Sequence, residues 1–532
     1  MKQKKWSLII LVLILIGGLI FMLLNQNPAP PLEPKSFNHV SVHDPSIIKE
    51  GDLFYMFGTH IEAAKSSDLM NWERFTNGYT TPNNVLFQDL SENLAESFLW
   101  AGEDDADSKD GYAVWAPEIF WNPNYINEDG SQGAYMLYYS ASSTYVRSAI
   151  GFAVAPQIEG PYTYVDTIVY SGFTKEEAYD ENSQVDKKWV HTHLPTLIEE
   201  GQISDINPDW FLGEERYHNA MYPNAIDANL FYDADGRLWM SYGSWSGGIF
   251  LLELDDQTGL PLYPGVDGIT EDGRLIDRYF GIKISGGEGQ SGEGPYIIYD
   301  AQTQYYYLYV TYGWLGADGG YNMRVFRAKE PTGPYLDIKD DDAVLKMGED
   351  NFTKGNKLMG NFLFTGEPGS TLASGYVSPG HNSVFHDEDT NKRYLVFHTR
   401  FPNAGEMYQA RVHQLFMNEA NWPVVAVHPY AGEQLRQVRK REIVGDYKFI
   451  NHGMSNSAAI VESIEIKLNT NQTLTGAVEG TWQKVDDYFA EIIINDIVYR
   501  GVFVEAWSPE KNDFVMTFTA VSDKGVSIWG SQ

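Results

Sequence analysis

Five segments of this 532-residue chain repeat one pattern, and the repeat restricts the possible folds more than any other feature. Each segment has a polar residue, a short strand of β-branched and aromatic residues, an acidic turn, and a second strand that ends in small residues. The gaps between segments leave room for two further strands each, and four-stranded units repeated around an axis are the blades of a β-propeller. We therefore predict an all-β fold with a five-bladed β-propeller. The five opening residues are Asp44, Glu118, Asp227, Glu293 and His381.

The chain outside the repeat divides into two further regions. Residues 1–35 hold a basic start, 17 uninterrupted apolar or glycine residues from Leu8 to Leu24, and a Pro-rich spacer. This pattern is typical of a signal peptide or an N-terminal membrane anchor, and it places the rest of the chain outside the cell. We predict a propeller catalytic domain over 36–436. The alternating strands that follow predict a small C-terminal β-barrel or sandwich domain over 437–532.

Composition and charge limit the possible partners. The chain is 43% hydrophobic and 14% aromatic, which excludes a disordered protein. Its formal net charge of −34 disfavours nucleic acid and anionic membrane surfaces, and fits a neutral substrate or a cationic ligand. The absence of Cys excludes disulfides, thiolate catalysis and thiolate zinc sites. A monomer is the favoured oligomeric state.

The opening residues of the five segments are the candidates for chemistry. In a propeller they converge near one end of the axis, where four acids and one imidazole are costly unless they have a function. Glycoside hydrolysis uses one protonated acid and one ionised carboxylate, and a third carboxylate can tune the acid's pKa. The repeat alone leaves Glu118 and Asp227 as equal candidates for that third place. His381 could coordinate a cation directly or through water, and an oxygen-rich site would suit Ca²⁺.

Aromatic residues near the same strand ends are candidate platforms for sugar rings. Most Trp residues belong to the core, so position along the repeat decides which of them to consider. Trp115 and Trp245 are the strongest candidates because each flanks a feature of the repeat, and Trp121 and Trp314 are further ones.

Several motifs carry a resemblance to a known family. They are "HDPSII", "WAPEIFW", "IGFAVA", "YPNAIDANLFYDADGRLWMSYGSWSGGIF", "GEGPYI" and "GHNSVF", and they span residues 43 to about 400 in the family's order. On these motifs the chain resembles glycoside hydrolase family 43, and within it the endo-α-1,5-L-arabinanases. The resemblance implies a five-bladed propeller and an inverting hydrolase, and the tail after residue 437 resembles the small β-barrel module of the larger, two-domain members.

The resemblance also implies roles for individual residues. Asp44 matches the general base, Glu293 the general acid, and Asp227 the residue that tunes the pKa of the acid and orients it. His381 matches the ligand of one Ca²⁺ ion in the propeller channel. Glu118 is expected to support the site or to contact substrate. The full set of expected substrate contacts is Asp44, Trp115, Glu118, Gly151, Asn224, Ala225, Ile226, Asp227, Ser244, Trp245 and Ser246.

The expected activity is extracellular endo-hydrolysis of α-1,5-L-arabinofuranosidic bonds in arabinan, the side chains of pectin, with inversion of configuration. Arabinan or arabino-oligosaccharides would be the substrate. One alternative is an exo-acting α-L-arabinofuranosidase or β-xylosidase of the same family, and another is a non-catalytic glycan-binding propeller. Two stretches, about 171–219 and 346–370, look like insertions and put the chain-length preference in doubt.

Overall fold

The structure is a computed structural model of the chain, and it describes residues 35–80, 82–101, 113–144, 146–180, 185–213, 215–366 and 375–532. The chain divides into two compact units, Met1–Lys35 and Ser36–Gln532, and all strands and helices given below belong to the second. The predicted signal peptide or membrane anchor lies outside the described residues. No helix among the described residues has the length and apolar character needed to cross a membrane.

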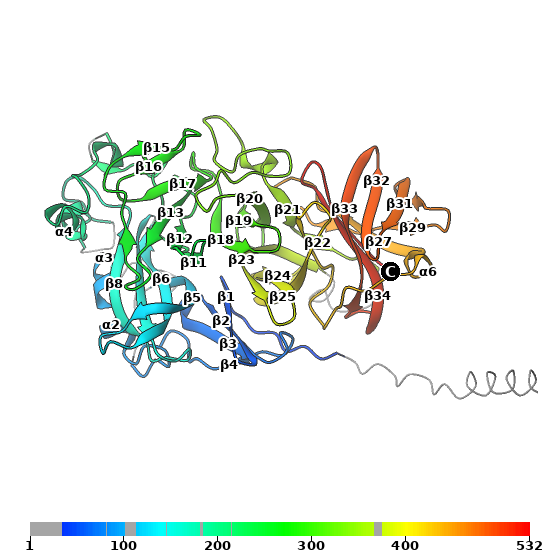
Figure 1. The fold of residues 1–532 in the computed structure, drawn as a ribbon, viewed down its shortest axis with the longest axis horizontal. Helices are drawn as coiled ribbons and strands as arrows, with labels where there is room; N and C mark the ends of the chain where they lie inside the picture. The colour runs from blue at the N-terminus through cyan, green and yellow to red at the C-terminus, as the bar shows by residue number, and fades with distance from the viewer. Residues whose placement is uncertain are drawn as a thin grey trace, which may run out of the picture. The chain divides into compact units, whose positions relative to one another are not determined.

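Within these ranges, the predicted hairpins lie in five separate antiparallel sheets (Figure 1). In four of the sheets, four consecutive strands pair in chain order as a regular meander. The regular meanders consist of β1 (Ser46–Glu50), β2 (Leu53–Gly58), β3 (Glu62–Ser66) and β4 (Glu73–Arg74); β5 (Ala113–Ile126), β6 (Gln132–Thr144), β7 (Arg147–Ala155) and β8 (Thr163–Tyr170); β18 (Glu293–Asp300), β19 (Tyr305–Tyr312), β20 (Asn322–Ala328) and β21 (Asn356–Met359); and β23 (Gly375–Asp387), β24 (Lys392–Arg400), β25 (Tyr408–Met417) and β26 (Pro423–Val425).

The third sheet in chain order departs from the predicted blade. Its fourth strand pairs with the third only after an excursion of the chain that adds short strands to the sheet. Among the described residues this sheet therefore has seven strands, and the prediction of five equal blades is corrected to four regular blades and one enlarged sheet. The enlarged sheet consists of β11 (Asn229–Tyr232), β12 (Leu238–Tyr242), β13 (Ile249–Leu254), β14 (Pro261–Leu262), β15 (Gly268–Ile269), β16 (Leu275–Asp277) and β17 (Gly281–Ser285).

The first strands of the five sheets contact one another in a closed cycle, in the order β1, β5, β11, β18, β23 and back to β1. Such a cycle places the five strand starts around a common axis, as in a propeller. The predicted all-β fold and propeller arrangement are therefore confirmed.

The cycle closes where the first and last sheets meet. A buried apolar cluster joins β1 and β2, through Ile47 and Met56, to β24 and β25, through Val396 and Val412. The Nζ atom of Lys49 adds an ion pair with an Asp387 oxygen at 2.8 Å. In Figure 1 the blue strands of the first sheet lie beside the yellow β24 and β25. Apolar packing rather than a shared strand holds the two ends of the repeat together.

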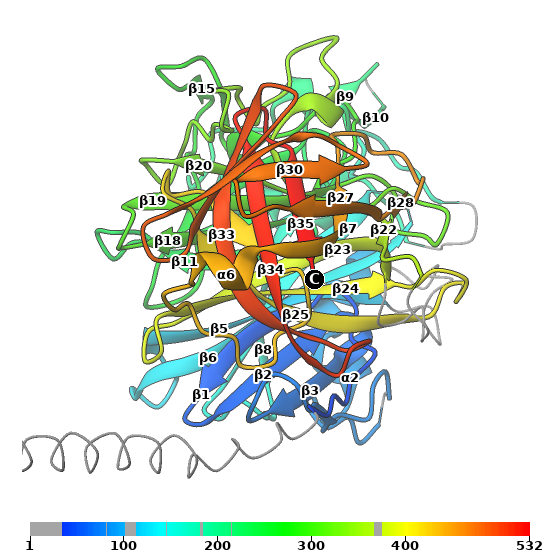
Figure 2. The same ribbon diagram turned by 90° about the vertical axis from the view of Figure 1, so that its right-hand side faces the viewer.

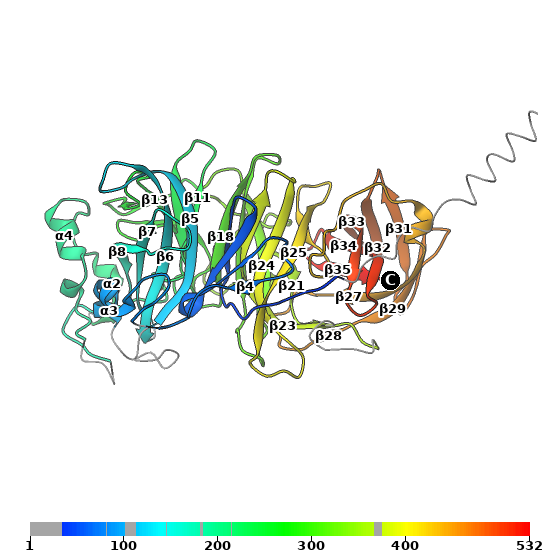
Figure 3. The same cartoon turned by 90° about the horizontal axis from the view of Figure 1, so that it is seen from below.

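The C-terminal strands form a closed barrel, as predicted, in which every strand has two neighbours (Figure 2). A parallel pairing of β22 (Phe362–Leu363) with β28 (Val461–Glu462) links the segment before barrel strand β29 to the last sheet of the propeller (Figure 3). The barrel strands are β27 (Gly445–Asn451), β29 (Ile464–Leu468), β30 (Thr473–Gly476), β31 (Gly480–Val485), β32 (Phe489–Ile494), β33 (Ile497–Ser508), β34 (Asp513–Ser522) and β35 (Ser527–Ser531).

Among the described residues, the helices are short and lie between strands. The expected insertion at 171–219 contains one of them and a small pair of strands, and its aromatic side chains pack on the enlarged third sheet. The ring of Trp210 lies 5.8 Å from that of Phe280, and the ring of Tyr217 lies 6.1 Å from it. The elements are α2 (Leu90–Asn93), α3 (Ala95–Ala101), α4 (Leu194–Glu199), α6 (Lys440–Ile443), β9 (Phe211–Leu212) and β10 (Arg216–Tyr217).

Candidate active site

In each sheet, one residue in or just before the first strand lies in the left-handed backbone region, two positions before the regular pairing with the second strand begins. A positive φ is unfavourable for residues other than glycine, and four of these five residues are not glycine, so the recurrence indicates that the fold requires this conformation. We call these residues the mouth layer. Their φ angles are 52° at Asp44, 39° at Ala116, 61° at Asp227, 55° at Gly294 and 47° at His381.

The mouth layer corrects the predicted alignment of the repeat. Ala116 and Gly294 hold the positions that the sequence pattern had given to Glu118 and Glu293. Glu118 lies two residues further along its strand, and Glu293 lies one residue earlier. The residues two places beyond the mouth layer each open the regular pairing with the second strand, and we call them the second layer. They are Ser46, Glu118, Asn229, Tyr296 and Ser383.

A cavity of about 20 Å³ lies where the strand starts meet. This volume is about the space that one water molecule needs. Of the five residues predicted to converge on one axis, Asp44, Glu118, Asp227 and His381 line this cavity, and Glu293 does not. Its remaining lining is Pro45, Ser46, Ala116, Pro117, Ala228, Pro295, Tyr296 and Asn382.

The carboxylate of Asp44 is surrounded by the imidazoles of three histidines. Its Oδ1 atom is 2.8 Å from Nδ1 of His43, 3.1 Å from Nδ1 of His381 and 3.5 Å from Nδ1 of His398. Its Oδ2 atom accepts a hydrogen bond of 2.5 Å from the Thr59 hydroxyl. Burial alone would raise the pKa of Asp44, but the imidazoles of His381, His43 and His398 hold that pKa well below its usual range. Asp44 is therefore ionised at neutral pH.

Asp227 has the opposite electrostatic character. Burial raises its pKa to about 7, His381 opposes the rise, and the nearby Glu293 and Asp44 carboxylates add to it. One Asp227 oxygen accepts from the backbone N–H of Gly294 at 3.1 Å, next to Glu293 in the chain. Asp227 thus holds the start of the strand that carries Glu293.

Glu293 is half-buried and held by two hydroxyl groups. Tyr321 donates to its Oε1 atom at 2.6 Å, and Ser244 donates to its Oε2 atom at 2.9 Å. Both carboxylate oxygens are therefore fixed in direction. Ser244 is among the predicted substrate contacts, whereas Tyr321, the residue directly before the third strand β20 of the same sheet, is not.

His381 lies between the acids. Burial lowers its pKa, but Asp44, Asp227 and Glu293 together raise it above the ordinary value. The close approach of Gly294 requires a glycine, since a Cβ atom there would lie 2.9 Å from the His381 ring and φ is 55°. His381 is thus packed tightly against the strand start beside Glu293.

Two groups of residues could hold a cation. His43, Asp44 and His398 each offer one ligand atom, and these atoms lie within 4.8 Å of one another. The second group is at the axial cavity, which Asn382 lines, and the amide of Asn382 is buried without a hydrogen-bond partner among the described residues. A hard cation such as Ca²⁺ fits this second group, which offers an unpaired amide oxygen, a carboxyl group and a small cavity. The cluster with two imidazoles suits softer metals.

Comparison with known proteins assigns the family. Residues 213–423 match the glycosyl hydrolases family 43, and residues 427–530 match a C-terminal lipocalin-like domain. The chain is 41% identical over 507 residues to an extracellular endo-α-(1→5)-L-arabinanase of Thermotoga petrophila, covering 94% of this chain and 95% of that one. This chain belongs to glycoside hydrolase family 43.

Two further similarities agree with this family. The chain is 40% identical over 505 residues to extracellular endo-α-(1→5)-L-arabinanase 2 of Bacillus subtilis, covering 93% of this chain and 94% of that one. The crystal structure of endo-1,5-α-L-arabinanase from Thermotoga petrophila matches with a TM-score of 0.77 and 39% identity, over 94% of this chain and 100% of that chain. Both domains of this family 43 chain are therefore covered by these relatives.

The carboxyl group of Glu118 makes its hydrogen bonds to other groups within the protein. It accepts from the Ser46 hydroxyl at 2.6 Å, the Asn229 amide at 3.1 Å and the Leu230 backbone N–H at 3.3 Å. Glu118 is only 2% exposed, and burial raises its pKa to about 8. These contacts join three neighbouring sheets, which favours the supporting role over a substrate contact.

The loop with Ser244, Trp245 and Ser246 lies against the strand of Glu293. The backbone N–H of Trp245 donates to the Gly292 carbonyl at 2.8 Å, and the Ser246 carbonyl accepts from Gly289 at 3.0 Å. Trp245 and Ser246 both have a φ of 46°. Trp245 is half-buried, so part of its surface stays exposed.

The stretch from Asn224 to Ile226 leads into the mouth layer at Asp227. The Ser171 hydroxyl accepts from the Ala225 backbone N–H at 2.9 Å and contacts the Asn224 side-chain oxygen at 3.3 Å. Ala225 and Ile226 are buried, so in this stretch the half-buried Asn224 presents the accessible side chain.

The remaining candidates lie at different depths. Gly151 is buried in β7, where a Cβ atom would lie 2.6 Å from the Tyr139 hydroxyl oxygen. Trp115 is half-buried in β5, one residue before mouth-layer Ala116. Trp314 is 57% exposed just beyond the end of β19. Trp121 is 42% exposed further along β5 and does not line the axial cavity.

Proposed function

We propose that this chain is an extracellular endo-α-1,5-L-arabinanase that hydrolyses arabinan with inversion of configuration. The observation that carries the proposal is the 41% identity to an extracellular endo-arabinanase over 94% of this chain, with carboxyl groups gathered at the mouth of the propeller. The name of that relative supports a secreted protein that acts on arabinan. The net charge of −34 is compatible with a neutral polysaccharide.

The proposed chemistry assigns one step to each acid. Asp44, kept ionised by the imidazoles around it, accepts a proton from the attacking water. Glu293 donates a proton to the leaving glycosidic oxygen, and its two hydrogen-bonded oxygens fix the direction of that transfer. Attack by water opposite the leaving group inverts the anomeric centre in one displacement. Asp227 orients the Glu293 strand and adds negative charge beside it.

Ca²⁺ in the propeller channel remains part of the proposal. His381 would be one ligand, and the unpaired Asn382 amide oxygen and the Glu118 carboxyl group line the same cavity. A bound cation would supply fixed positive charge behind the acids. We expect EDTA to lower activity and added Ca²⁺ to restore it, measured as initial rate on arabinan. Restoration by Zn²⁺ but not by Ca²⁺ would favour the His43, Asp44 and His398 cluster instead.

Substrate contacts are proposed for the accessible residues around Glu293, with Trp245 and Trp115 as platforms and Ser244, Ser246 and Asn224 as polar contacts. Gly151, Ala225 and Ile226 would act by shaping the cleft, because they are buried. The division into 36–436 and 437–532 is proposed as well, and it is supported by the two family matches, which end at 423 and begin at 427.

The test is a product profile with purified residues 36–532 on linear debranched arabinan. Short arabino-oligosaccharides and a rapid fall in polymer size are expected, and proton NMR of the fresh products should show the inverted anomer. Release of arabinose alone would replace the endo proposal with the exo-acting alternative. Activity on xylan alone would indicate a β-xylosidase-like relative, and no release from either polymer would indicate a binding protein.

A further inference from the structure

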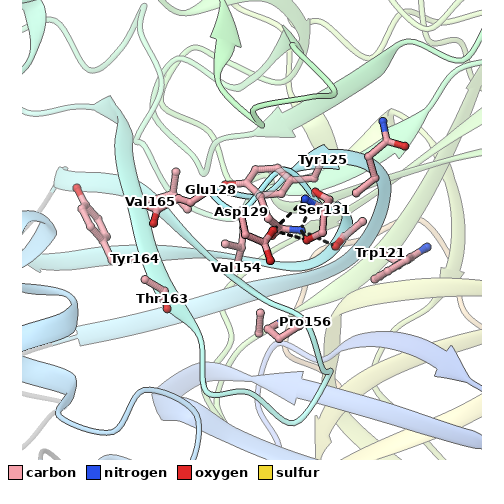
Figure 4. A pocket seen from close by; sticks show the side chains of 14 residues that line it. Trp121, Tyr125, Glu128, Asp129, Ser131, Val154, Pro156, Thr163, Tyr164 and Val165 are labelled. Carbon is pink, nitrogen blue, oxygen red and sulfur yellow. Dashed lines mark hydrogen bonds between the residues drawn. The ribbon is translucent and has the colours of Figure 1, made fainter.

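A second pocket lies on the second sheet, away from the axial cavity. Its volume is about 630 Å³, within the range of ~300–1,000 Å³ typical of ligand sites. The turn between β5 and β6, the end of β7 and the start of β8 form it (Figure 4). We call it the blade-edge pocket, and Trp121, Tyr125, Gln132, Pro156 and Tyr164 are among its lining residues.

The register of the second sheet separates this pocket from the active site. Ala116 lines the axial cavity near the start of β5, whereas Ile126 ends the strand at the turn. The lining residues that come nearest to each other along β5 are Glu118 of the axial cavity and Trp121 of the blade-edge pocket, three positions or roughly 10 Å apart at ~3.3 Å per residue, and the turn lies further away. A ligand in the blade-edge pocket therefore does not compete for the space in which Glu293 acts.

An exposed aromatic ring stands at one end of the blade-edge pocket. Trp121 is 42% exposed, although its ring lies 4.7 Å from that of Tyr135. A Cβ atom at Gly133 would lie 2.9 Å from the Trp121 ring, so glycine there lets the ring settle against β6. Figure 4 shows Tyr164 on the opposite side of the pocket. A supported, exposed indole is a ready platform for the apolar face of a sugar ring.

The polar groups of the pocket select against anions. Among the described residues that line it none is basic, whereas Glu128 and Asp129 are acidic. Asp129 accepts from the Ser131 hydroxyl at 2.6 Å, and Asn127 donates to the Gly133 carbonyl at 3.1 Å, so the turn is internally braced. Glu128 and Gln132 are exposed at its surface and can bind hydroxyl groups. This chemistry fits a neutral polyhydroxyl ligand and repels a polyuronate.

We infer that the blade-edge pocket is a second, non-catalytic binding site for a neutral polysaccharide, occupied by a stretch of the same polymer that the active site cleaves. The choice of polymer rests on the proposed function. A chain bound at this pocket stays near the enzyme, which raises its effective concentration at the active site. The site should therefore matter for long substrates and not for oligosaccharides too short to reach both places.

The kinetic test compares Trp121→Ala with a matched control, Leu262→Ala, which removes another exposed side chain, 49% exposed on β14 and outside both sites. Trp121→Ala should raise KM on linear arabinan by about threefold to tenfold, as expected for loss of a contact residue. It should leave the rate on a short arabino-oligosaccharide unchanged, and the control should match wild type on both substrates. Equal KM values on the polymer for all three proteins would overturn the inference.

A binding test separates this inference from the proposed function. Native gels containing arabinan, xylan, galactan or polygalacturonate would measure retardation of Glu293→Gln protein, with and without Trp121→Ala. Retardation by a neutral glycan that is lost with Trp121→Ala supports the pocket, even if wild type fails to cleave arabinan. Retardation by polygalacturonate would contradict the inference. Retardation by neutral glycans that does not depend on Trp121 would contradict it as well. The double variant Glu128→Ala and Gln132→Ala gives the same readout without removing an aromatic ring, and it should also weaken retardation.

Discussion

The mouth layer and the second layer lie two residues apart on the same strands, yet they hold their polar groups in different ways. In the second layer, Ser46, Glu118 and Asn229 form a continuous chain of hydrogen bonds across three sheets. In the mouth layer, Asp44 and Asp227 have pKa values displaced in opposite directions, and each displacement involves His381. Burial alone therefore does not make a carboxyl group functional. The difference lies in whether they are held by neutral hydrogen-bond donors alone or lie beside other ionisable groups.

The largest expected effect comes from the acids at the mouth. Glu293→Gln and Asp44→Asn should each lower kcat on arabinan by about 10³-fold or more, because a general acid or base is lost. Their unfolding free energies should stay within about 1 kcal/mol of wild type, since both substitutions keep the shape of the side chain. Initial rates and urea unfolding measure the two quantities. Full activity in either variant would remove that residue from its proposed role.

The second layer should show the reverse pattern. Glu118→Ala leaves the Ser46 hydroxyl, the Asn229 amide and the Leu230 N–H without their acceptor, which should cost about 3 kcal/mol of stability. Urea unfolding of the variant and wild type at pH 6 measures the loss, with Glu118→Gln as the control that keeps the side-chain volume. A stable Glu118→Ala protein that has lost activity would instead place Glu118 at the substrate.

Glu118 also predicts a pH dependence of stability. Burial raises its pKa from 4.5 to about 8, so the folded protein retains a proton that the unfolded chain releases above about pH 4.5. The contribution of this group to stability is fully present below that pH and is lost as pH rises towards 8. The unfolding free energy of wild type should therefore fall between pH 5 and 8 more steeply than that of Glu118→Gln, which has no carboxyl group to titrate. Parallel curves would contradict the raised pKa.

The strand repeat could be read from the sequence, whereas its alignment at two of five strand starts could not. Side chains two residues apart point to the same face of a strand, so a shift of two residues places Glu118 on the correct face of β5 but in the wrong layer. At β18, an irregularity between Glu293 and Tyr296 absorbs the shift of one residue. The proline that follows the mouth layer in three sheets, Pro45, Pro117 and Pro295, was the better marker of the register.

Other parts of the site depended on contacts that no local pattern reveals. His43 and His398 stack with ring centroids 3.6 Å apart although they are 355 residues apart in the chain. The parallel pairing of β22 with β28 likewise joins distant segments. The hydroxyl groups at the mouth were predictable in part, because Thr59, Ser140 and Ser244 occupy the small-residue ends of the second strands that define the repeat.

Two hydroxyl groups, those of Thr59 and Ser46, give the finest test of the comparison between layers. Thr59 donates to Asp44 in the mouth layer at 2.5 Å, and Ser46 donates to Glu118 in the second layer at 2.6 Å. Thr59→Val removes a hydrogen bond to an ionised group and should lower kcat/KM by about tenfold, since such bonds contribute ~1.5–3 kcal/mol.

Ser46→Ala should instead lower the unfolding free energy by about 1 kcal/mol and leave kcat/KM unchanged, because a neutral hydrogen bond contributes that much to folding. Each variant serves as the control for the other: both remove one hydroxyl that donates to a buried carboxyl group, with Ser46 at the start of β1 and Thr59 directly after the end of β2. If both variants lost activity equally, the two layers would act as one hydrogen-bonded unit. If Thr59→Val lost only stability, then Asp44 would be held in place by the imidazoles around it and the Thr59 hydroxyl would not contribute to its function.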